Sequence, residues 1–167
     1  MDKTLEVETD APVVRRLKPR DLEAVINVDA AILGRRREEF FKVKLAQNLA
    51  ETGIEVSLAA EYLGGFAGYL LARVFYGEFG QTERVAVLDS FGVHPRCEGH
   101  GVARALLQQL RTNLLGLGIH TLRTEVDWND QALLSFFHHE GFQPAPRLCL
   151  DLDLEHARRL DERRASS

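Results

Sequence analysis

The sequence is poor in cysteine, and its cysteines have no spacing typical of a metal site. Cys97 and Cys149 are the two cysteines of the chain, and they form neither a zinc motif nor the framework of a disulfide-stapled protein. Structural zinc and disulfide scaffolds are therefore not expected. This cysteine usage suits a reducing compartment, and we expect a cytoplasmic protein.

Long apolar runs and an excess of positive charge are also missing. No apolar stretch approaches the roughly 20 residues that a membrane-spanning helix needs, and the start Met1-Asp2-Lys3 has no apolar signal-peptide core. The net charge is −4 and the isoelectric point is about 5.9. We therefore expect neither a membrane nor a nucleic acid as a partner.

The sequence does contain enough apolar material for one core. With 167 residues and 45% hydrophobic content, it predicts a single domain over residues 1–167. The polar stretch 1–11 and the charged stretch 155–167 are expected to be loose tails, the latter a frayed helix or a disordered end.

Hydrophobic periodicity predicts alternating strands and helices. Predicted strands cover residues 13–17, 54–62, 65–76, 85–93, 120–126 and 148–154. Predicted helices run from Pro19 to a stop at Gly34, over residues 38–51, onward from Val102, and over residues 131–139. The last strand rests on the alternation of Leu148, Leu150, Leu152 and Leu154, which is typical of an antiparallel strand.

The stretch from Val85 to Leu115 is the most informative one. Its apolar strand ends near Val93, glycines follow at Gly99 and Gly101, and apolar residues then recur at helical spacing. A strand, a glycine loop and a helix N-terminus can bind phosphate, because unpaired amides and the helix dipole point the same way. A turn that needs glycine only for its geometry is the alternative, since neither dinucleotide-fold nor P-loop spacing is present.

A wider pattern favours the phosphate site. The run Val93-x-Pro95-x-x-Glu98-Gly99-x-Gly101-Val102-Ala103-x-x-Leu106-Leu107 resembles motif A of the GCN5-related N-acetyltransferases (GNAT family), which reads V-x-P-x-x-Q/R-x-x-G-x-G/A before a helix with a Leu-Leu pair. The resemblance extends to Gly141-Phe142 and the final apolar strand, so it covers the second half of the chain well and the first half loosely.

This resemblance implies an α/β fold with a mixed, mostly antiparallel central sheet, splayed middle strands and flanking helices. It also implies acetyl-CoA as the acetyl donor. The coenzyme diphosphate would lie on the loop formed by Arg96, Cys97, Glu98, Gly99, His100, Gly101, Val102, Ala103 and Arg104. The backbone of Phe91, Gly92 and Val93 would pair with the pantetheine arm; Gly92 suits a bulge or a close approach, or is a packing glycine.

Two positions depart from the family pattern. Glu98 stands where Gln or Arg is usual, and a carboxylate beside a diphosphate is repulsive unless it turns away or pairs with Arg96, His100 or Arg104. The family's tyrosine acid falls on Phe137 when counted back from Gly141-Phe142, and phenylalanine has no proton to give. The thiolate then leaves unassisted or with help from another donor.

Acetyl transfer to an amine also needs a proton acceptor. Asp89 and Glu125 lie on the strands expected to flank the cleft, and Asp89 is the first choice. Burial would raise the pKa of such a carboxylate toward neutrality. Each could instead be a salt-bridged structural carboxylate, and the proton could leave through water. The family's cofactor-facing Asn falls on Asp130, beside Asn129.

Three other groups receive structural interpretations. Arg35-Arg36-Arg37 precedes two glutamates and is taken as a solvated corner. His138 and His139 would point about 100° apart on a helix, so they make no metal pair. Cys97 has no evident base and is taken as a small filler.

The resemblance thus implies an N-acetyltransferase that uses acetyl-CoA and a primary amine of a small molecule or peptide. A non-catalytic acyl-CoA-binding or regulatory module is the alternative, and an unrelated nucleotide-phosphate-binding domain has less support. The acceptor site is expected in the loops 33–42 and 77–84, whose sequences do not identify it. Exposed sheet edges leave a homodimer open.

Overall fold

The computed structural model describes residues 10–50, 56–76, 80 and 82–165, with the backbone alone for residues 49 and 50. Its contacts divide the chain into two units, Met1–Asp127 and Trp128–Ser167, and each is described by itself. The predicted end of the second helix at residue 51, the predicted strand start at residue 54 and part of the loop 77–84 lie outside the described residues.

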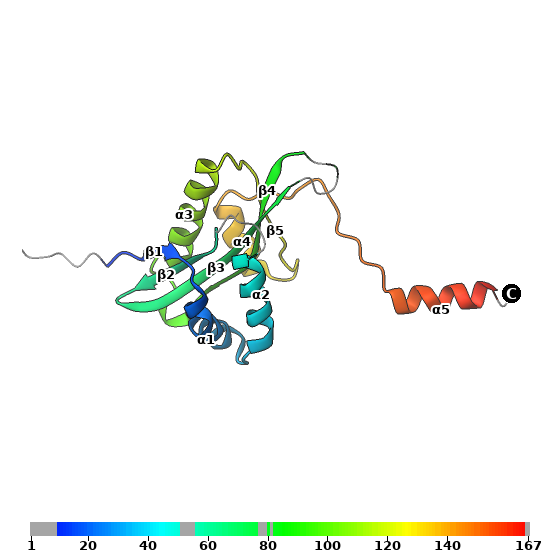
Figure 1. Ribbon diagram of the computed structural model, residues 1–167, viewed down its shortest axis with the longest axis horizontal. Helices are drawn as coiled ribbons and strands as arrows, with labels where there is room; N and C mark the ends of the chain where they lie inside the picture. Colours follow the sequence, from blue (N-terminus) through cyan, green and yellow to red (C-terminus); the bar gives the residue numbers. More distant parts are fainter. Residues whose placement is uncertain (1–9, 51–55, 77–79, 81, 166–167) are drawn as a thin grey trace, which may run out of the picture. The chain divides into compact units, whose positions relative to one another are not determined.

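The first unit is built on a five-stranded sheet with the order β1-β2-β3-β4-β5. The strands are β1 (Val13–Arg16), β2 (Leu58–Tyr62), β3 (Gly65–Tyr76), β4 (Arg84–Val93) and β5 (Leu122–Thr124), labelled in Figure 1. The first four are antiparallel neighbours, whereas β4 and β5 are parallel. The predicted mixed and mostly antiparallel sheet is confirmed.

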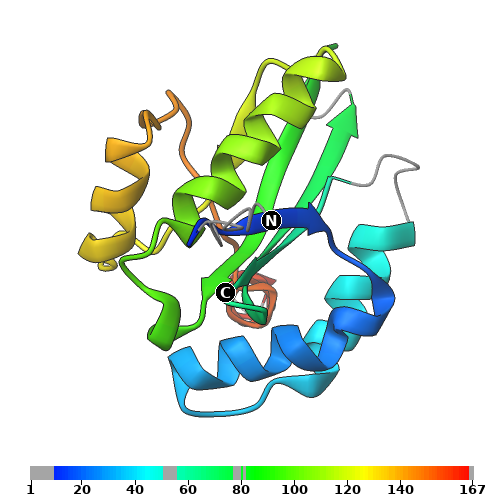
Figure 2. The same ribbon diagram turned by 90° about the vertical axis from the view of Figure 1, so that its left-hand side faces the viewer.

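Helices cover both faces of this sheet, as Figures 1 and 2 show: α1 (Leu22–Leu33) and α2 (Glu38–Ala50) on one face, α3 (Val102–Gly116) on the other. Two consecutive residues of β3 illustrate the division. Gly68 faces Val102 and Leu106 of α3, whereas the Tyr69 ring packs edge-on against Phe41 of α2 at 5.7 Å between centroids. Successive side chains of a strand point to opposite faces of the sheet, so each helical layer packs against alternate residues of β3.

The helix α3 has the apolar stripe that its helical spacing predicts. The predicted stripe of α3 is entirely buried and comprises Val102, Leu106, Leu107, Leu110 and Leu114. The opposite core joins α1 and α2 to the sheet through Leu17, Val25, Ile26, Val28, Phe41, Leu45, Ala59, Tyr69 and Leu71. Helical spacing of apolar residues therefore predicted the buried face of α3, whereas Phe40 and Val43 of α2 are exposed.

Left-handed backbone ends two elements where the sequence predicts it. Gly34 (φ 71°) follows the last turn of α1 and donates its N–H to Ala30 O at 2.8 Å. Leu63 (φ 49°) and Gly64 (φ 77°) turn the chain from β2 into β3, and positive φ at both positions is the type I′ hairpin turn.

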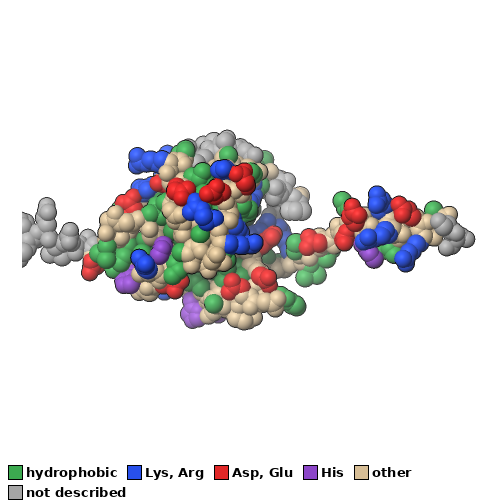
Figure 3. Space-filling model, turned by 90° about the horizontal axis from the view of Figure 1, so that it is seen from below, with side chains coloured by type: hydrophobic (Ala, Val, Ile, Leu, Met, Phe, Trp, Pro, Cys, Tyr) green, Lys and Arg blue, Asp and Glu red, His purple; other side chains and the backbone are tan. Residues whose placement is uncertain are grey.

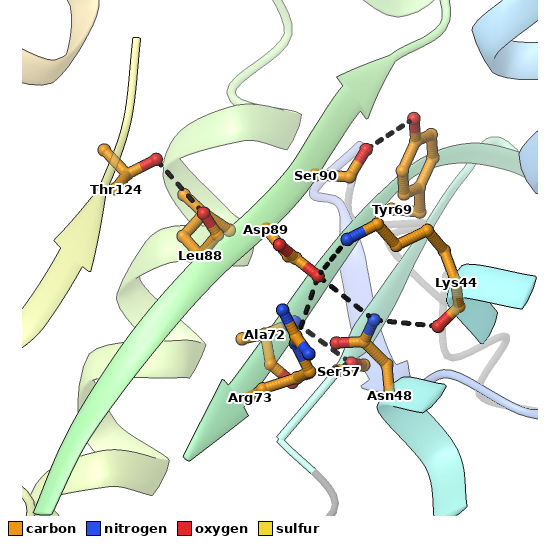
Figure 4. Close-up of polar contacts among 10 residues, drawn as sticks. All are labelled: Lys44, Asn48, Ser57, Tyr69, Ala72, Arg73, Leu88, Asp89, Ser90 and Thr124. Carbon is orange, nitrogen blue, oxygen red and sulfur yellow. Dashed lines mark hydrogen bonds and ion pairs between the residues drawn. The ribbon is translucent and has the colours of Figure 1, made fainter. Parts of the chain in front are cut away.

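Strand β4 contains one extra residue. Leu88 pairs with Ala72 and Ser90 pairs with Leu71, so Asp89 has no opposite residue on β3. Such a β-bulge lets two residues that are adjacent in sequence face the same side. Asp89 and Ser90 accordingly both contact side chains on the α1/α2 face, as Figure 4 shows.

The parallel ladder between β4 and β5 is short. It ends at the pair Leu88–Thr124, where Thr124 Oγ1 also donates to Leu88 O at 3.1 Å. The predicted strand 120–126 is thus shortened to Leu122–Thr124, while β4 continues to Val93. The two strands separate at the bulge, in agreement with the expected splay.

The second unit contains α4 (Gln131–His139) and α5 (Leu154–Ala165). The predicted strand 148–154 is wrong: this segment joins no ladder among the described residues, and Leu148 and Leu150 are 88% and 86% exposed. The chain instead enters a helix, because Asp153 Oδ1 accepts the N–H groups of Glu155 and His156 at 3.0 and 3.1 Å. This N-cap begins α5 in the stretch expected to be a frayed helix or a disordered end.

Candidate functional site

In the loop between β4 and α3, both glycines of the predicted phosphate site have a left-handed backbone conformation and border open space. After the single turn η3 (Pro95–Cys97), Gly99 has φ 76° and Gly101 has φ 79°. A Cβ built at either position would meet no atom within 4 Å. The glycines are therefore required by their backbone conformation and border free space, which is what close approach of a phosphate needs.

The start of α3 supplies the amides for such a ligand. Gly101 is the N-cap, and its carbonyl accepts the N–H of Ala105 at 2.9 Å. Helix geometry gives the earlier amides of Val102 and Ala103 no acceptor inside the helix. Together with the helix dipole they make an anion site, so the residues present fit a diphosphate group.

Contacts of the loop side chains stabilise the shape of the loop. His94 Nδ1 accepts the N–H of Arg96 at 3.1 Å. The ring of His100 stacks on Tyr62 at 4.9 Å between centroids, and its Nδ1 lies 2.9 Å from Glu98 O. Cys97 is half-buried, and its thiol is free.

Glu98 does not form the ion pair that the sequence suggested. Its side chain is exposed and contacts no cationic group among the described residues. Of the two alternatives left open for Glu98, pairing with Arg96, His100 or Arg104 is therefore not the one observed. The carboxylate turns to solvent instead, which is the other way to reduce repulsion with a diphosphate.

Gly92 is a close-approach site and not the bulge, which lies at Asp89. A Cβ at Gly92 would stand 2.8 Å from Tyr69 Cε1 and 3.2 Å from Ile32 Cδ1. The Tyr69 ring therefore fills the space beside the β4 backbone, while Phe91 and Val93 are half-buried neighbours.

Asp89 lies at the centre of a polar cluster on the α1/α2 face, drawn in Figure 4. Its Oδ2 accepts from Lys44 Nζ at 3.1 Å and, more weakly, from Asn48 Nδ2 at 3.5 Å. Arg73 Nε also lies 3.1 Å from Oδ2. This last contact is an ion pair without hydrogen-bond alignment, because the buried Nε has no acceptor in line with its N–H.

The surroundings of Asp89 keep it ionised. Burial by itself would raise the pKa of this carboxyl, but the hydrogen bond from Lys44 and the positive charge of Arg73 outweigh burial. The pKa of Asp89 is therefore lowered, and the expectation of a raised value is wrong for this residue. The contacts of Asp89 match the alternative interpretation, a structural carboxylate held by salt bridges.

Two further polar pairs lie near the Asp89 cluster: Tyr69 with Ser90, and Arg37 with Asp29. The hydroxyls of Tyr69 and Ser90 are 3.3 Å apart, and burial raises the pKa of Tyr69 to about 12. Arg37 donates from Nε to Asp29 Oδ2 at 2.9 Å, and its Cζ lies 4.6 Å from the Phe40 ring centroid. Tyr69 thus stays protonated at neutral pH, next to a compensated Arg–Asp pair.

The arginine triplet is only partly the solvated corner that was predicted, because Arg35 and Arg36 are exposed but Arg37 is half-buried and paired with Asp29. Arg36 donates to Glu23, Asn27 and Glu38 at 2.8 to 3.2 Å. Figure 3 shows acidic and basic side chains interspersed on the face that it presents. Mixed charge of this kind is poorly suited to a polyanion.

Glu125 follows β5 directly and is exposed. It thus comes one residue after Thr124, at which the β4–β5 ladder ends. Glu125 therefore lies just after β5, and not on the strand where the sequence predicted it, at the point where the β4–β5 ladder ends.

The remaining predicted residues belong to the second unit. Asp130 caps α4 by accepting the N–H of Leu133 at 3.0 Å, and Asn129 O accepts from Gln131 N at the same distance. Phe137 is buried and packs against Phe136 and Phe142 at 5.4 and 4.8 Å between ring centroids. Asp130 and Asn129 thus accept hydrogen bonds at the start of α4, and Phe137 packs against neighbouring aromatic rings, all within the second unit.

The described part of the chain contains no group of three or more His, Cys, Asp or Glu side chains that could hold a metal ion. His139 Nδ1 lies 2.7 Å from Ser135 O, which agrees with a helix-end position. None of the described helices is long and apolar enough to cross a bilayer.

Sequence reasoning missed three members of the Asp89 cluster: Lys44, Asn48 and Arg73. One signal was available for Arg73, a cation in the middle of the otherwise apolar run of β3. Lys44 and Asn48 are four residues apart and so lie on one face of α2. Nothing in their spacing indicated that this face meets Asp89.

Comparison with known proteins agrees with this architecture. Residues 24–142 match the model of the Acetyltransferase (GNAT) family. No curated protein sequence matches the chain closely enough to count as a relative.

Solved structures share the fold at low identity. A transcriptional regulator from Bacillus halodurans C-125 has a TM-score of 0.71 at 18% identity, over 86% of this chain and 99% of that one. The aminoglycoside N-acetyltransferase AAC(6')-Iy in complex with CoA has a TM-score of 0.69 at 15% identity, over 86% and 95%. The ribosomal-protein-S18-alanine N-acetyltransferase from Escherichia coli has a TM-score of 0.66 at 24% identity, over 80% and 79%.

The family model covers well over half of the chain, and it includes the β4 strand, the glycine loop and α3. On these grounds the chain belongs to the GNAT acetyltransferase family.

Proposed function

We propose that this protein transfers an acetyl group from acetyl-CoA to a primary amine. The observation that carries the proposal is the open glycine loop at the N-terminus of α3, placed at the end of the strand that parts from β5. A diphosphate on the loop amides directs the rest of the coenzyme along the strand that precedes the loop. The thioester would then lie near the point where β4 and β5 separate.

The reaction needs one bond to form and one to break. The neutral amine attacks the thioester carbonyl, the carbon–sulfur bond breaks, and coenzyme A leaves as the thiolate. The amine nitrogen loses a proton to a base. Backbone N–H groups of β4 near Gly92 are the proposed donors to the oxyanion that develops on the carbonyl oxygen.

Glu125 is our proposed base in place of Asp89. Three nitrogen atoms already surround Asp89 Oδ2, and its lowered pKa makes it a poor proton acceptor near neutrality. Glu125 is exposed beside the end of the parallel ladder and has no such cationic partners among the described residues. Phe137 cannot donate a proton, so the thiolate is proposed to leave without it.

The test is release of free coenzyme A thiol from acetyl-CoA in the presence of a broad amine panel. The panel includes amino acids, peptide N-termini, polyamines and aminoglycosides. Glu125→Gln is expected to lower kcat by about 10²-fold or more, whereas Glu23→Gln, an exposed carboxylate paired with Arg36, is the matched control. Acetyl-CoA binding without transfer to any amine would instead indicate the non-catalytic module.

A further inference from the structure

The side chain of Arg73 is a mostly buried cation that makes only some of the hydrogen bonds and ion pairs it could make. Its side chain is 20% exposed, and its Nε contacts Asp89 Oδ2 at 3.1 Å without forming a hydrogen bond. It donates no hydrogen bond to any other described residue, and its Cζ lies 5.0 Å from the Phe75 ring centroid. A guanidinium offers five N–H donors in a rigid fork that fits a carboxylate. Burying the Nε of this group without an acceptor is unfavourable.

Asn48 supplies a second, independent sign of an unfilled position. Its side chain is 1% exposed. The amide nitrogen donates to Lys44 O at 2.8 Å, but Oδ1 accepts from no donor in the described part of the chain. Buried amide oxygens in native proteins are nearly always paired. A ligand that carries an N–H group would satisfy it.

The charge of the cluster identifies the kind of ligand. Lys44 and Arg73 are positive and Asp89 is negative, so the cluster as a whole carries one excess positive charge. The neighbouring Arg37 and Asp29 neutralise one another. A single carboxylate would balance the cluster, whereas a phosphate dianion would exceed it and an additional ammonium would add to it.

The cluster also lies where an acceptor is needed. Asp89 is the bulged residue of β4, at the point where the ladder to β5 ends. The same strand reaches the glycine loop after Val93, which is four residues and roughly 13 Å farther along. One strand therefore joins the proposed coenzyme site to the cluster on the α1/α2 face, and Lys44 is 25% exposed there.

We propose that the acceptor is an amine that also bears a carboxylate, of amino-acid type. Arg73 and Lys44 bind the carboxylate, and Asn48 Oδ1 accepts an N–H of the same molecule. Asp89 is a positioning residue that holds the two cations toward the site. The inference rests on the proposed acetyltransferase function and adds the substrate class to it.

The experiment compares each standard amino acid with its own carboxamide, which replaces the carboxylate. Because loss of the adjacent negative charge lowers the pKa of the amine, each rate is referred to the neutral amine present at the assay pH. Coenzyme A release gives kcat/KM for both members of each pair. Thermal unfolding in the presence of coenzyme A reports binding of the same compounds without any transfer. For at least one pair, the acid is expected to exceed the amide about tenfold or more in kcat/KM and to raise the Tm further.

Variants identify the residues responsible. Arg73→Gln should lower kcat/KM for the acid by about tenfold or more through KM, with the rate for the amide little changed. Arg73→Lys keeps the charge but loses the fork, so it should retain part of the preference. Arg84→Gln is the matched control, since Arg84 is exposed and donates to Leu117 O at 3.0 Å. If Arg73→Gln does not fold, Lys44→Gln, at a more exposed position, gives the same comparison.

The outcomes separate the two proposals. Transfer without preference for acids, or a preference that survives Arg73→Gln, would overturn the carboxylate site and leave the acetyltransferase function standing. Acids that raise the Tm without being acetylated would support the site and count against the function. If no amino acid either raises the Tm or is acetylated, the carboxylate site is wrong.

Discussion

The loop glycine Gly101 offers the most direct test of the coenzyme site. Its φ of 79° is left-handed, and a Cβ there would meet no atom within 4 Å. A leucine at such a φ costs roughly 1–2 kcal/mol, which for a chain of this size lowers the Tm by about 2–8 °C. Gly101→Leu should therefore fold, because the side chain enters free space and not a packed core.

Coenzyme A binding should respond far more than stability. The leucine side chain would stand where the diphosphate approaches the amides of α3. Losing two charge-assisted hydrogen bonds, worth about 1.5–3 kcal/mol each, corresponds to at least roughly hundredfold weaker binding. Isothermal titration with coenzyme A measures this directly.

A second glycine provides the control. Gly64 at the β2–β3 turn has φ 77°, and a Cβ there also meets nothing within 4 Å. Gly64→Leu therefore carries the same backbone strain at a site remote in sequence from the loop. The difference in affinity between the two variants isolates the contribution of the loop. Equal coenzyme A affinity in Gly101→Leu and Gly64→Leu would refute the assignment of the diphosphate site.

Three further predictions use other residues. Glu98→Gln should bind coenzyme A at least as tightly as the parent in the same titration, because it removes a negative charge near the diphosphate; a large loss would mean that Glu98 makes a needed contact. Gly92→Ala should lower the free energy of unfolding by about 1–3 kcal/mol in urea melts, since its Cβ would stand 2.8 Å from the buried Tyr69 ring; unchanged stability would show that the ring can move. The pKa of Tyr69, raised to about 12, lies above the unfolded value of about 10, so its contribution to stability is complete below pH 10 and is lost between pH 10 and 12. Tyr69→Phe should remove that part of the alkaline decline, and an identical pH dependence of both proteins would contradict the shift.

Local signals in the sequence predicted most of the elements. Apolar spacing placed α3 and its buried stripe, and Gly34 and Gly64 marked the ends of elements, because left-handed backbone strongly favours glycine. The glycine loop after β4 was found for the same reason. Each of these features depends on residues that are close together in the chain.

The failures arose where a local pattern competed with another or where distant residues meet. Leu148 to Leu154 alternates like a strand, but Asp153 caps a helix within the same stretch. The Asp89 cluster joins α2, β3 and β4, so the lowered pKa of Asp89 depends on packing that a linear pattern does not contain. For the same reason, the sequence could propose Asp89 as a base but could not reveal its partners.

The bulge in β4 has a consequence for how the polar cluster is attached to the sheet. Leu88 and Ser90 lie opposite the consecutive residues Ala72 and Leu71. Removal of Asp89 would therefore leave an uninterrupted ladder in which all the remaining side chains keep their present faces. The carboxylate is thus an insertion in an otherwise regular strand. Within this family, a sequence one residue shorter at this point would keep the sheet and lose the anchor for Lys44 and Arg73. Lys44 and Arg73 would then be mostly buried without their counter-charge, so the inserted residue links the stability of the contact between α2 and the sheet to the proposed acceptor site.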